Sequence, residues 1–596
     1  MHSRRPNHLF LLSTETSRSS SLLSPRLNTN GILHSRSPPP SPSLPSLIPR
    51  HGKKLSGTLS ISWRRQFRFL LVLCALVGLT WAALKAAYTL RYRTVGRGGV
   101  TPGNYEIIED TSLPKEPSAV IVVDKKSRNR WTVHIPKSFG FPLQPEQYRE
   151  ICTQSLEASH YLGGGYRAEG KSYYHKDPFF IDVKEAEEQD LLPQSAQASS
   201  EGTGPKVCER SLTYVLETSH AGMGNSLLGL WLAYGLAQKE KRAFFIDDSR
   251  WPYGKFSTYF NMPNLNELRP NGCLPPPESH ILPCPQQARH LMVSAETTKY
   301  TFGSAFEAEY SHSGPSGQKA IFDMARAGYE AFFHLAETED AQYADNRTLE
   351  LQEKVQKGGG MVIGLHIRRG DRHPWEYQYS KDYLPLDRYW DTARDILTDR
   401  FEPSPTSSRI TGSHKAANEK GMNPMMAEMS SVTILASDDP DIYSHSEMAR
   451  AERAQSRIQL ASKSALEAAS GGKKNKYIDE ISGWEGGFFS SLFWSLGQKL
   501  RATDMPQYKP HNAQTDSKGI AKQEEVPQQA LQLRQLVGRA YLLDLAVLSK
   551  SDAIVCSVSS TACRLLAVMM GWDKAIKQGW WRNVDRGANG WMGLEY

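Results

Sequence analysis

Hydrophobic residues along this chain gather in short runs separated by polar stretches, a pattern typical of an α/β protein. Apolar runs of four or five residues predict buried strands at 213–216, 242–246, 361–365, 432–436 and 553–556. Longer periodic segments predict helices near 226–238, 386–397, 531–548 and 561–570. In the first region a strand, a glycine-containing loop, a helix and a second strand form a βαβ unit. We therefore expect a first α/β lobe over 206–355 and a second, Rossmann-like lobe over 356–596.

One apolar segment, residues 68–90, is too long for a strand and stands beside polar sequence. About 20 residues at a rise of 1.5 Å cross a bilayer core, and Lys85 can reach the far interface. Arg64, Arg65 and Arg68 precede the apolar residues, which favours a cytoplasmic amino terminus. The alternative is a buried core helix. We expect a single-pass signal anchor with the carboxyl-terminal body in the secretory lumen.

The positive charge of the chain is concentrated before this segment. Residues 1–68 hold eleven Lys and Arg residues and one acidic residue, whereas the whole chain has a formal net charge of +8. The remainder is thus slightly acidic, and a nucleic-acid partner is not indicated. Residues 1–67 are rich in Ser, Pro and Arg and predict a disordered tail. Residues 91–205 are expected to be a lumenal stem and linker, and the polar inserts 403–430 and 504–528 to be loops.

The cysteines agree with a lumenal body. Cys74 lies in the apolar segment, and six remain outside it, without the Cys-x-x-Cys pair typical of zinc sites. Disulfides are the default in an oxidising lumen, although the sequence alone leaves their pairing open. Asn346 begins an Asn-Arg-Thr glycosylation sequon.

The segment from His366 to Asp371 carries the most specific chemistry. It follows an apolar strand, and ligands bind at the carboxyl ends of strands in open α/β sheets. The planar guanidinium groups of Arg368 and Arg369 suit paired contacts with phosphate oxygens. One alternative is a surface ion-pair cluster. Another is an adhesion tripeptide beginning at Arg369, which the strand context disfavours. We expect a diphosphate site.

Three further segments point to the same chemistry. A glycine loop opens the helix at 226–238, so its backbone N–H groups can face an anion. The strand at 432–436 ends in paired carboxylates. Asp439-Pro440-Asp441 also resembles a metal-binding pair of carboxylates. No metal is expected, because Arg368 can already neutralise the phosphates. The strand at 553–556 leads to hydroxyl residues that cap a helix. The candidate donor-binding residues from these segments are Gly222, Gly224, Asn225, Asp438, Asp439, Asp544, Ser559, Ser560 and Thr561.

The motifs occur in one order along roughly residues 205–575: GMGNS, WPY, HIRRGD, LASDDP and DAIVCSVSSTACR. Together they resemble the α1,6-fucosyltransferases of glycosyltransferase family 23, which includes the N-glycan core and bacterial nodulation enzymes. The resemblance implies a GT-B architecture of two Rossmann-like lobes with a cleft between them. It also implies GDP-fucose as donor, inversion at the anomeric carbon, no cofactor or metal, and a type II protein of the Golgi membrane.

The resemblance also implies roles for single residues. Arg368 would hold the β-phosphate, with His366, Arg369 and Asp371 shaping its pocket. Glu376 falls at the position of the proposed catalytic base, and Arg372 at that of an assisting lysine. Tyr253, Asp438, Asp439, Asp544 and Ser560 match positions that serve nucleotide binding or activity, and Cys556 and Cys563 match a disulfide.

Some residues depart from the family pattern. Gly370 replaces a threonine, Thr561 replaces a glutamine, and the SH3 domain of the animal core enzymes does not follow the last motif.

The expected function is transfer of L-fucose from GDP-fucose to a glycan or glycoprotein hydroxyl, in α1,6 linkage. One alternative is a transferase for another GDP-sugar or for protein hydroxyls. An alternative from another class is an inactive nucleotide-sugar or glycan-binding protein. The sequence leaves the acceptor and the oligomeric state open.

Overall fold

The computed structural model describes residues 113–163, 173–195, 206–217, 222–369, 384–401, 428–460, 528–585 and 590–594, except 313 and 315, together with five two-residue strands. All of them belong to the compact unit Gly99–Tyr596. The predicted tail 1–67, the apolar segment 68–90 and nearly all of both inserts lie outside the described residues. Within these described ranges, no helix combines the length and apolarity needed to cross a membrane.

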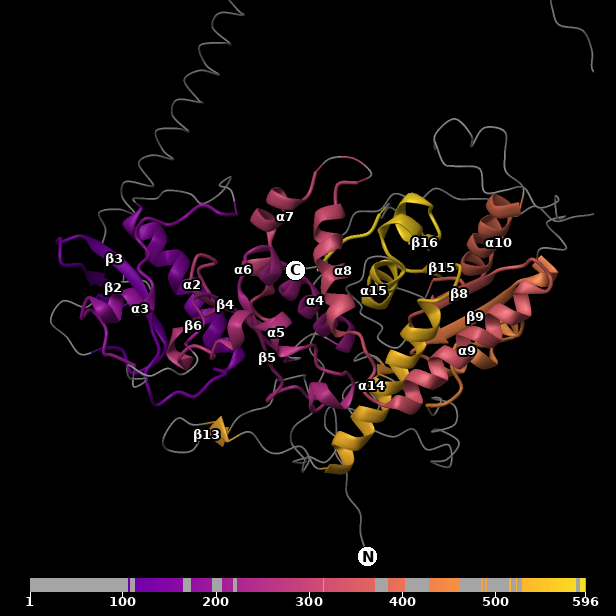
Figure 1. Cartoon of the computed structure of the whole chain (residues 1–596), viewed down its shortest axis with the longest axis horizontal. Helices are drawn as coiled ribbons and strands as arrows, with labels where there is room; N and C mark the ends of the chain where they lie inside the picture. Colours follow the sequence, from indigo (N-terminus) through magenta and orange to yellow (C-terminus); the bar gives the residue numbers. More distant parts are fainter. Residues whose placement is uncertain are drawn as a thin grey trace, which may run out of the picture. The chain divides into compact units, whose positions relative to one another are not determined.

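The first parallel sheet has the strand order β5-β4-β7-β6. Its strands are β4 (Ser211–Val215), β5 (Ala243–Asp247), β6 (Ile281–Leu282) and β7 (His290–Val293). Helix α4 (Met223–Lys239) follows β4 and is apolar around most of its circumference, so it is buried. It packs against α8 (Lys319–Phe332) at a glycine: a Cβ on Gly328 would lie 2.2 Å from the Cα of Trp231. The two helix backbones therefore come unusually close (Figure 1).

Residues before this sheet are folded, and the hydrophobic pattern predicted no element there. They form β1 (Glu106–Ile107), β2 (Ser118–Val123), β3 (Asn129–His134), α2 (Pro145–Leu162) and α3 (Val183–Glu188). Strands β2 and β3 pair antiparallel, and their apolar faces share a core with β6 and β7. Two disulfides, Cys152–Cys284 and Cys208–Cys273, fasten this region. The segment expected to be a stem and linker thus contributes side chains to the core of the first sheet.

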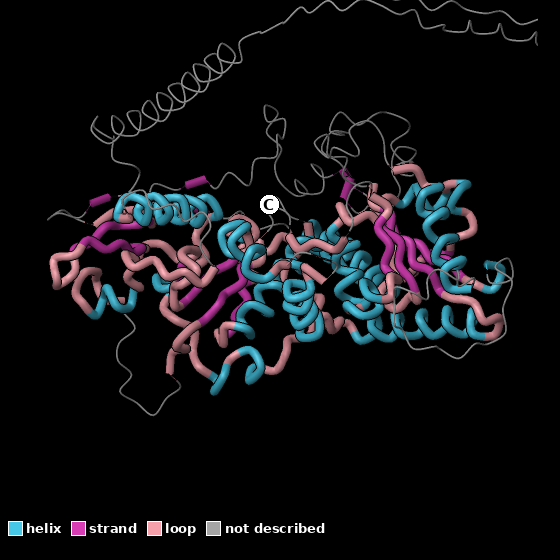
Figure 2. Tube along the Cα trace, turned by 90° about the horizontal axis from the view of Figure 1, so that it is seen from above, coloured by secondary structure: helices cyan, strands magenta, loops and turns pink. Residues whose placement is uncertain are grey.

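The second parallel sheet has the order β10-β9-β8-β15-β16. Its strands are β8 (Val362–Ile367), β9 (Val432–Ser437), β10 (Glu452–Arg453), β15 (Ala553–Cys556) and β16 (Trp581–Asn583). Successive residues of β8 point alternately to opposite faces. Ile363, Leu365 and Ile367 share a core with α10 (Asp387–Phe401), whereas Val362 packs with residues of α14 (Gln528–Leu548) and α15 (Thr561–Met570). Helices therefore cover both faces (Figure 2).

The remaining elements are short, apart from α9 (Thr338–Gln356), which packs along α14. The others are α5 (Leu265–Leu268), α6 (Thr298–Thr301), α7 (Ser304–Tyr310), β11 (Trp484–Glu485), β12 (Phe488–Phe489), β13 (Gln514–Thr515), β14 (Ala521–Lys522) and several single-turn helices. The molecule is a mixed α/β protein with parallel sheets, as predicted. Every predicted strand and helix named above is present, with ends shifted by no more than four residues.

Candidate functional site

The carboxyl ends of three central strands lie level at one edge of the second sheet. His366 of β8 pairs in register with Ala436 of β9 and with Cys556 of β15. The residues that follow these strands include Arg368, Asp438 and Ser557. Sequence-distant motif segments are therefore brought to a single sheet edge, where an open α/β sheet binds ligands.

His366 is an uncharged side chain at neutral pH. It is buried at the end of β8, and burial, with a smaller contribution from the positive charge of Arg368, lowers its pKa to about 3. Its Nδ1 atom forms no hydrogen bond in the part of the chain that the structure describes. A neutral imidazole can donate or accept a hydrogen bond, but it adds no charge next to the exposed Arg368.

The paired carboxylates after β9 hold backbone in place. Asp438 Oδ1 accepts a hydrogen bond from the backbone N–H of Arg369 at 2.8 Å, which ties the ends of β8 and β9 together. Asp439 caps the short helix η5 (Pro440–Ser444) by accepting a hydrogen bond from the N–H of Asp441 at 3.0 Å. No group of three His, Cys, Asp or Glu residues able to hold a metal ion occurs within the described ranges.

The amino termini of α4 and α15 meet. Gly222 and Ser560 are the residues that precede their first turns, and the Thr561 hydroxyl donates a hydrogen bond to Asn225 Oδ1. A Cβ on Gly224 would lie 2.7 Å from Tyr541 Oη and 3.4 Å from Thr561 Cβ, so only glycine fits this approach. Two helix amino termini, each with unpaired N–H groups and positive potential, thus lie together.

Residues at and just after the end of β16 hold the loop that leads into α15. The Ser557 hydroxyl donates to the Asp585 carboxylate at 2.7 Å, and the N–H of Ser559 donates to Asp585 Oδ2 at 2.9 Å. The N–H of Val558 donates to Asn583 Oδ1 at 2.8 Å. Sequence reasoning missed Asn583 and Asp585; the signal that could have found them is an Asn-x-Asp pattern ending a strand.

The same loop contains the disulfide that the resemblance implied. Cys556 at the end of β15 and Cys563 in the first turn of α15 are joined, with 5.5 Å between their Cα atoms. Ser560, which precedes α15, is buried, and its hydroxyl finds no partner in the described ranges.

Asp544 of α14 is a carboxyl group whose charged form is disfavoured. Burial raises its pKa well above the ordinary value, and the opposing effects of Arg453 and Gln455 are smaller. The Arg453 guanidinium lies over the Tyr443 ring at 3.7 Å, and the Tyr443 hydroxyl accepts a hydrogen bond from the N–H of Ser437 at 2.9 Å. Asp544 therefore lies beside the edge formed by β9 and β10, where burial favours its uncharged form.

Tyr253 lies in a loop that packs on α14. Its carbonyl accepts a hydrogen bond from the Tyr259 hydroxyl at 2.9 Å, and Arg534 donates to the carbonyl of Pro252 at 3.3 Å. Gly254 has φ +96°, and a Cβ there would approach Gln535. The structure therefore attaches Tyr253 to α14, the helix that carries Asp544.

Three candidate residues, Asp371, Arg372 and Glu376, lie outside the described residues, as does Gly370, which departs from the family pattern. Asn346, in the predicted glycosylation sequon, is exposed on α9.

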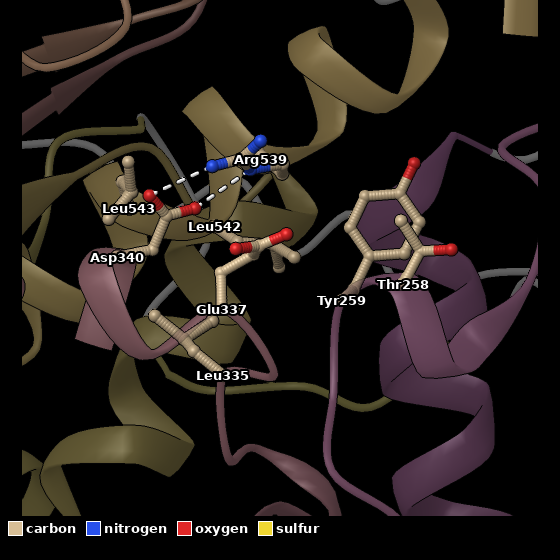
Figure 3. A pocket seen from close by; sticks show the side chains of 8 residues that line it. All are labelled: Thr258, Tyr259, Leu335, Glu337, Asp340, Arg539, Leu542 and Leu543. Atoms are coloured by element: carbon tan, nitrogen blue, oxygen red, sulfur yellow. Dashed lines mark hydrogen bonds and ion pairs between the residues drawn. The ribbon is translucent and has the colours of Figure 1, made fainter. Parts of the chain in front are cut away.

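A small cavity between α14 and the Tyr259 loop is structural (Figure 3). Its volume is about 10 Å³, far below that of a nucleotide. In its wall the Asp340 carboxylate accepts hydrogen bonds from Arg539 at 2.8 and 3.0 Å and from Arg457 at 2.7 Å. Burial raises the pKa of Asp340, but the hydrogen bonds of both arginines together outweigh burial and hold the pKa below its usual range.

No family model matches this sequence, and no curated protein matches it either. Solved structures with a similar arrangement include the Bradyrhizobium fucosyltransferase NodZ, which is 14% identical over 60% of this chain and 92% of that chain, with a TM-score of 0.24. NodZ α1,6-fucosyltransferase soaked with GDP-fucose is 12% identical over 61% and 92%, with a TM-score of 0.26. A mutant of Arabidopsis thaliana FUT1 in complex with GDP is 13% identical over 72% and 79%, with a TM-score of 0.27. Similarity at this level leaves the function to be argued from the site itself.

Proposed function

We propose that this chain is an inverting glycosyltransferase of GT-B type that moves L-fucose from GDP-fucose to a glycan hydroxyl, in α1,6 linkage. The observation that carries the proposal is the convergence of the motif segments. The ends of β8, β9 and β15 lie level, and the amino terminus of α4 is bonded to that of α15. Convergent arginines, hydroxyls and helix amino termini suit a nucleoside diphosphate.

In this proposal the diphosphate is neutralised by the protein. Arg368 donates paired hydrogen bonds to it, and the N–H groups at the starts of α4 and α15 add positive potential. His366 is uncharged at neutral pH, and burial raises the pKa of Asp544, which weakens the repulsion that its carboxylate would exert on the phosphates. This arrangement supplies a physical reason to expect transfer without a metal ion.

The chemical step is a single displacement at fucose C1. The acceptor oxygen forms its bond to C1 while the bond from C1 to the diphosphate breaks, and GDP leaves with the electron pair. Glu376 takes the proton of the acceptor hydroxyl, a role worth about 10²–10⁴-fold in rate, and Arg372 assists it. Arg368 stabilises the charge that grows on GDP, and electrostatic stabilisation of this kind usually contributes more to an enzyme's rate than any other single effect.

A donor screen tests this proposal. The full-length protein, purified in detergent, is assayed for hydrolysis of GDP-fucose, GDP-mannose and a UDP-sugar, with and without EDTA, and for GDP binding by calorimetry. We expect hydrolysis of GDP-fucose that EDTA does not change. Preference for a UDP-sugar, or loss of activity in EDTA, would contradict the proposal. Turnover of GDP-mannose favours another GDP-sugar, and GDP binding without turnover favours a binding protein.

We further propose that residues 68–90 anchor the protein in the Golgi membrane with its body in the lumen. The three disulfides agree with this placement, because such bonds form and persist in oxidising compartments. Protease treatment of sealed Golgi vesicles should remove the amino-terminal tail alone. Digestion of the body in intact vesicles would contradict the proposal.

A further inference from the structure

Glu217 is an unexplained carboxylate at the carboxyl end of the first sheet. It lies two residues after β4 and is only 5% exposed. Neither of its oxygens accepts a hydrogen bond of ordinary geometry, and no other carboxylate in the described ranges has both oxygens in that state. A buried polar group without a partner is costly, so such a group calls for a specific explanation.

Several polar groups surround Glu217. Ser294, at the end of β7, is fully buried; its hydroxyl is the hydrogen-bonding neighbour of Glu217, although the two groups do not meet in ordinary hydrogen-bond geometry. Burial raises the pKa of Glu217 to about 7, and the neighbouring Ser294 hydroxyl and Arg250 lower it only in part. The ionisable groups of this cluster interact with Glu217 or with its neighbour Tyr148. They come from α2, β4 and the ends of β5 and β7: Glu146, Tyr148, Tyr214, Asp247, Arg250 and Glu296.

Two of these neighbours are already engaged elsewhere. The Tyr148 hydroxyl accepts a hydrogen bond from the N–H of Leu143 at 2.9 Å, and Arg250 donates to the carbonyl of Leu143. Both groups hold the backbone of one residue, Leu143, in the segment before α2. Apart from the contact between Glu217 and Ser294, the acceptor capacity of the Glu217 carboxylate has no partner of ordinary geometry in the described residues.

The charges around Glu217 limit the kind of ligand that could bind there. An anion would be repelled, because Arg250 is the single cation among these six neighbours and the others are carboxylates or phenols, which never carry positive charge. A metal ion is not indicated, because no three ligating residues come together here in the described part of the chain. The fitting chemistry is a neutral hydrogen-bond donor, and the commonest such group on a sugar is a hydroxyl.

We propose that Glu217 and Ser294 form a hydroxyl-binding subsite for the acceptor glycan. The proposal rests on the transferase function proposed above. It places acceptor recognition at the end of β4, five residues before Gly222, where α4 begins and is bonded to α15. The Glu217 carboxylate accepts a hydrogen bond from one ring hydroxyl of the glycan, and the Ser294 hydroxyl hydrogen-bonds to a second. Both are specificity residues, and no bond is made or broken at either.

The test separates acceptor binding from donor use. Full-length wild type, Glu217→Ala, Glu217→Gln and Ser294→Ala are assayed for GDP-fucose hydrolysis and for transfer to a fluorescent N-glycan. We expect Glu217→Ala to raise the glycan KM about tenfold or more, the usual effect of losing a hydrogen bond to a charged group. GDP affinity and GDP-fucose hydrolysis should stay within twofold. Glu217→Gln keeps an acceptor oxygen, so its KM should rise by no more than about threefold.

A pH profile adds a readout that a purely structural role would not move. In wild type the glycan KM should fall as pH rises through 7, because the ionised carboxylate is the stronger acceptor, whereas Glu217→Gln should show no such change. Glu296→Gln is the control, because it also removes one negative charge at this edge of the first sheet. The Glu296 carboxylate already has Arg149 as a partner at 3.5 Å, so the dependence of the glycan KM on pH should remain in this variant.

The outcomes are distinguishable. Unchanged glycan KM in a folded Glu217→Ala protein overturns the subsite while leaving the donor chemistry intact. If that variant does not fold, Ser294→Ala decides, because it removes one hydroxyl without adding bulk; an unchanged glycan KM there overturns the subsite equally. A wild type that neither binds GDP nor hydrolyses GDP-fucose refutes the proposed function, and the subsite falls with it.

Discussion

At the scale of single residues, the proposed chemistry depends on which side chains at the edge of the second sheet are charged and which are neutral. Arg368 is exposed at the end of a strand, whereas His366 two residues earlier is buried and neutral. Burial raises the pKa of Asp544 and so favours its uncharged form. The second sheet therefore offers a cation to a diphosphate, while burial opposes negative charge on Asp544. Sequence pattern predicted Arg368 and His366 together, but the contrast in their charge comes from burial, which depends on residues far away in the chain.

The guanidinium geometry of Arg368 should be essential. We expect Arg368→Ala to abolish GDP-fucose hydrolysis and Arg368→Lys to lose at least about a hundredfold, since lysine cannot make the paired contact. Steady-state hydrolysis and GDP calorimetry measure this. The matched control is Arg450→Ala, at an exposed arginine that belongs to none of the motifs. Near-normal turnover of Arg368→Lys would count heavily against the proposed role.

The ionisation of Glu217 should make stability depend on pH. Its pKa is about 7 when folded and near 4.5 when unfolded, so the folded state holds the proton more tightly. Stability is then fully present below pH 4.5 and declines until about pH 7, by roughly 3 kcal/mol in all. Glu217→Gln should match wild type near pH 4.5 and unfold at higher denaturant at pH 8. Parallel curves for the two proteins across this range would disprove the assignment.

At the scale of elements, local patterns predicted the strands and helices of both sheets well. The hydrophobic pattern of a buried strand or an amphipathic helix lies within one short stretch of sequence, so it can be recognised there. The same reasoning failed for β2, β3 and α2. Their core partners, such as Ile281 and Met292, lie more than a hundred residues away. It also failed for Asn583 and Asp585, which act on a loop that precedes them by about 25 residues. The apolar run at 119–123 is a local signal for β2 that the expectation of a stem left unused, whereas the long-range pairings themselves leave no periodic signal.

The junction of α4 with α14 and α15 makes a steric prediction. Gly224→Ala should destabilise the protein by roughly 1–3 kcal/mol, the usual cost of overpacking, because its new Cβ would meet the Tyr541 hydroxyl at 2.7 Å. Removing that hydroxyl in Gly224→Ala/Tyr541→Phe should restore most of the loss. Denaturant unfolding of both single variants and the double variant gives the coupling. Additive effects would show that the two groups do not compete for space.

At the scale of the whole molecule, two parallel sheets are linked by helices rather than by a shared strand. Beside the second sheet, α9, α14 and the segment after β10 meet at the carboxylate of Asp340. Figure 3 shows its pair with Arg539 of α14. Sequence reasoning assigned no role to Asp340, Arg457 or Arg539, because charged residues on helices normally predict only a solvated face. Here two arginines converge on one buried carboxylate.

Asp340→Asn should therefore weaken the contact between α9 and α14. Removing one partner of a fully buried pair costs about 3–5 kcal/mol, but both arginines are partly exposed and water can solvate them. We expect a loss of roughly 2 kcal/mol, together with a smaller decline in stability below pH 4 than wild type shows. Glu339→Gln, at an exposed partner of Arg457, should cost under about 1 kcal/mol. Equal losses in the two variants would exclude a special role for Asp340.

The bond between Cys152 and Cys284 closes a covalent ring across 132 positions, with all of β4, α4 and β5 inside it. A shortened form of this protein could be designed to begin near residue 206, just before the first parallel strand, β4. Such a fragment would lack Cys152, so Cys284 would be left as a free thiol. It would also expose the apolar side chains that β2 and α2 cover. A usable fragment has to begin before residue 113.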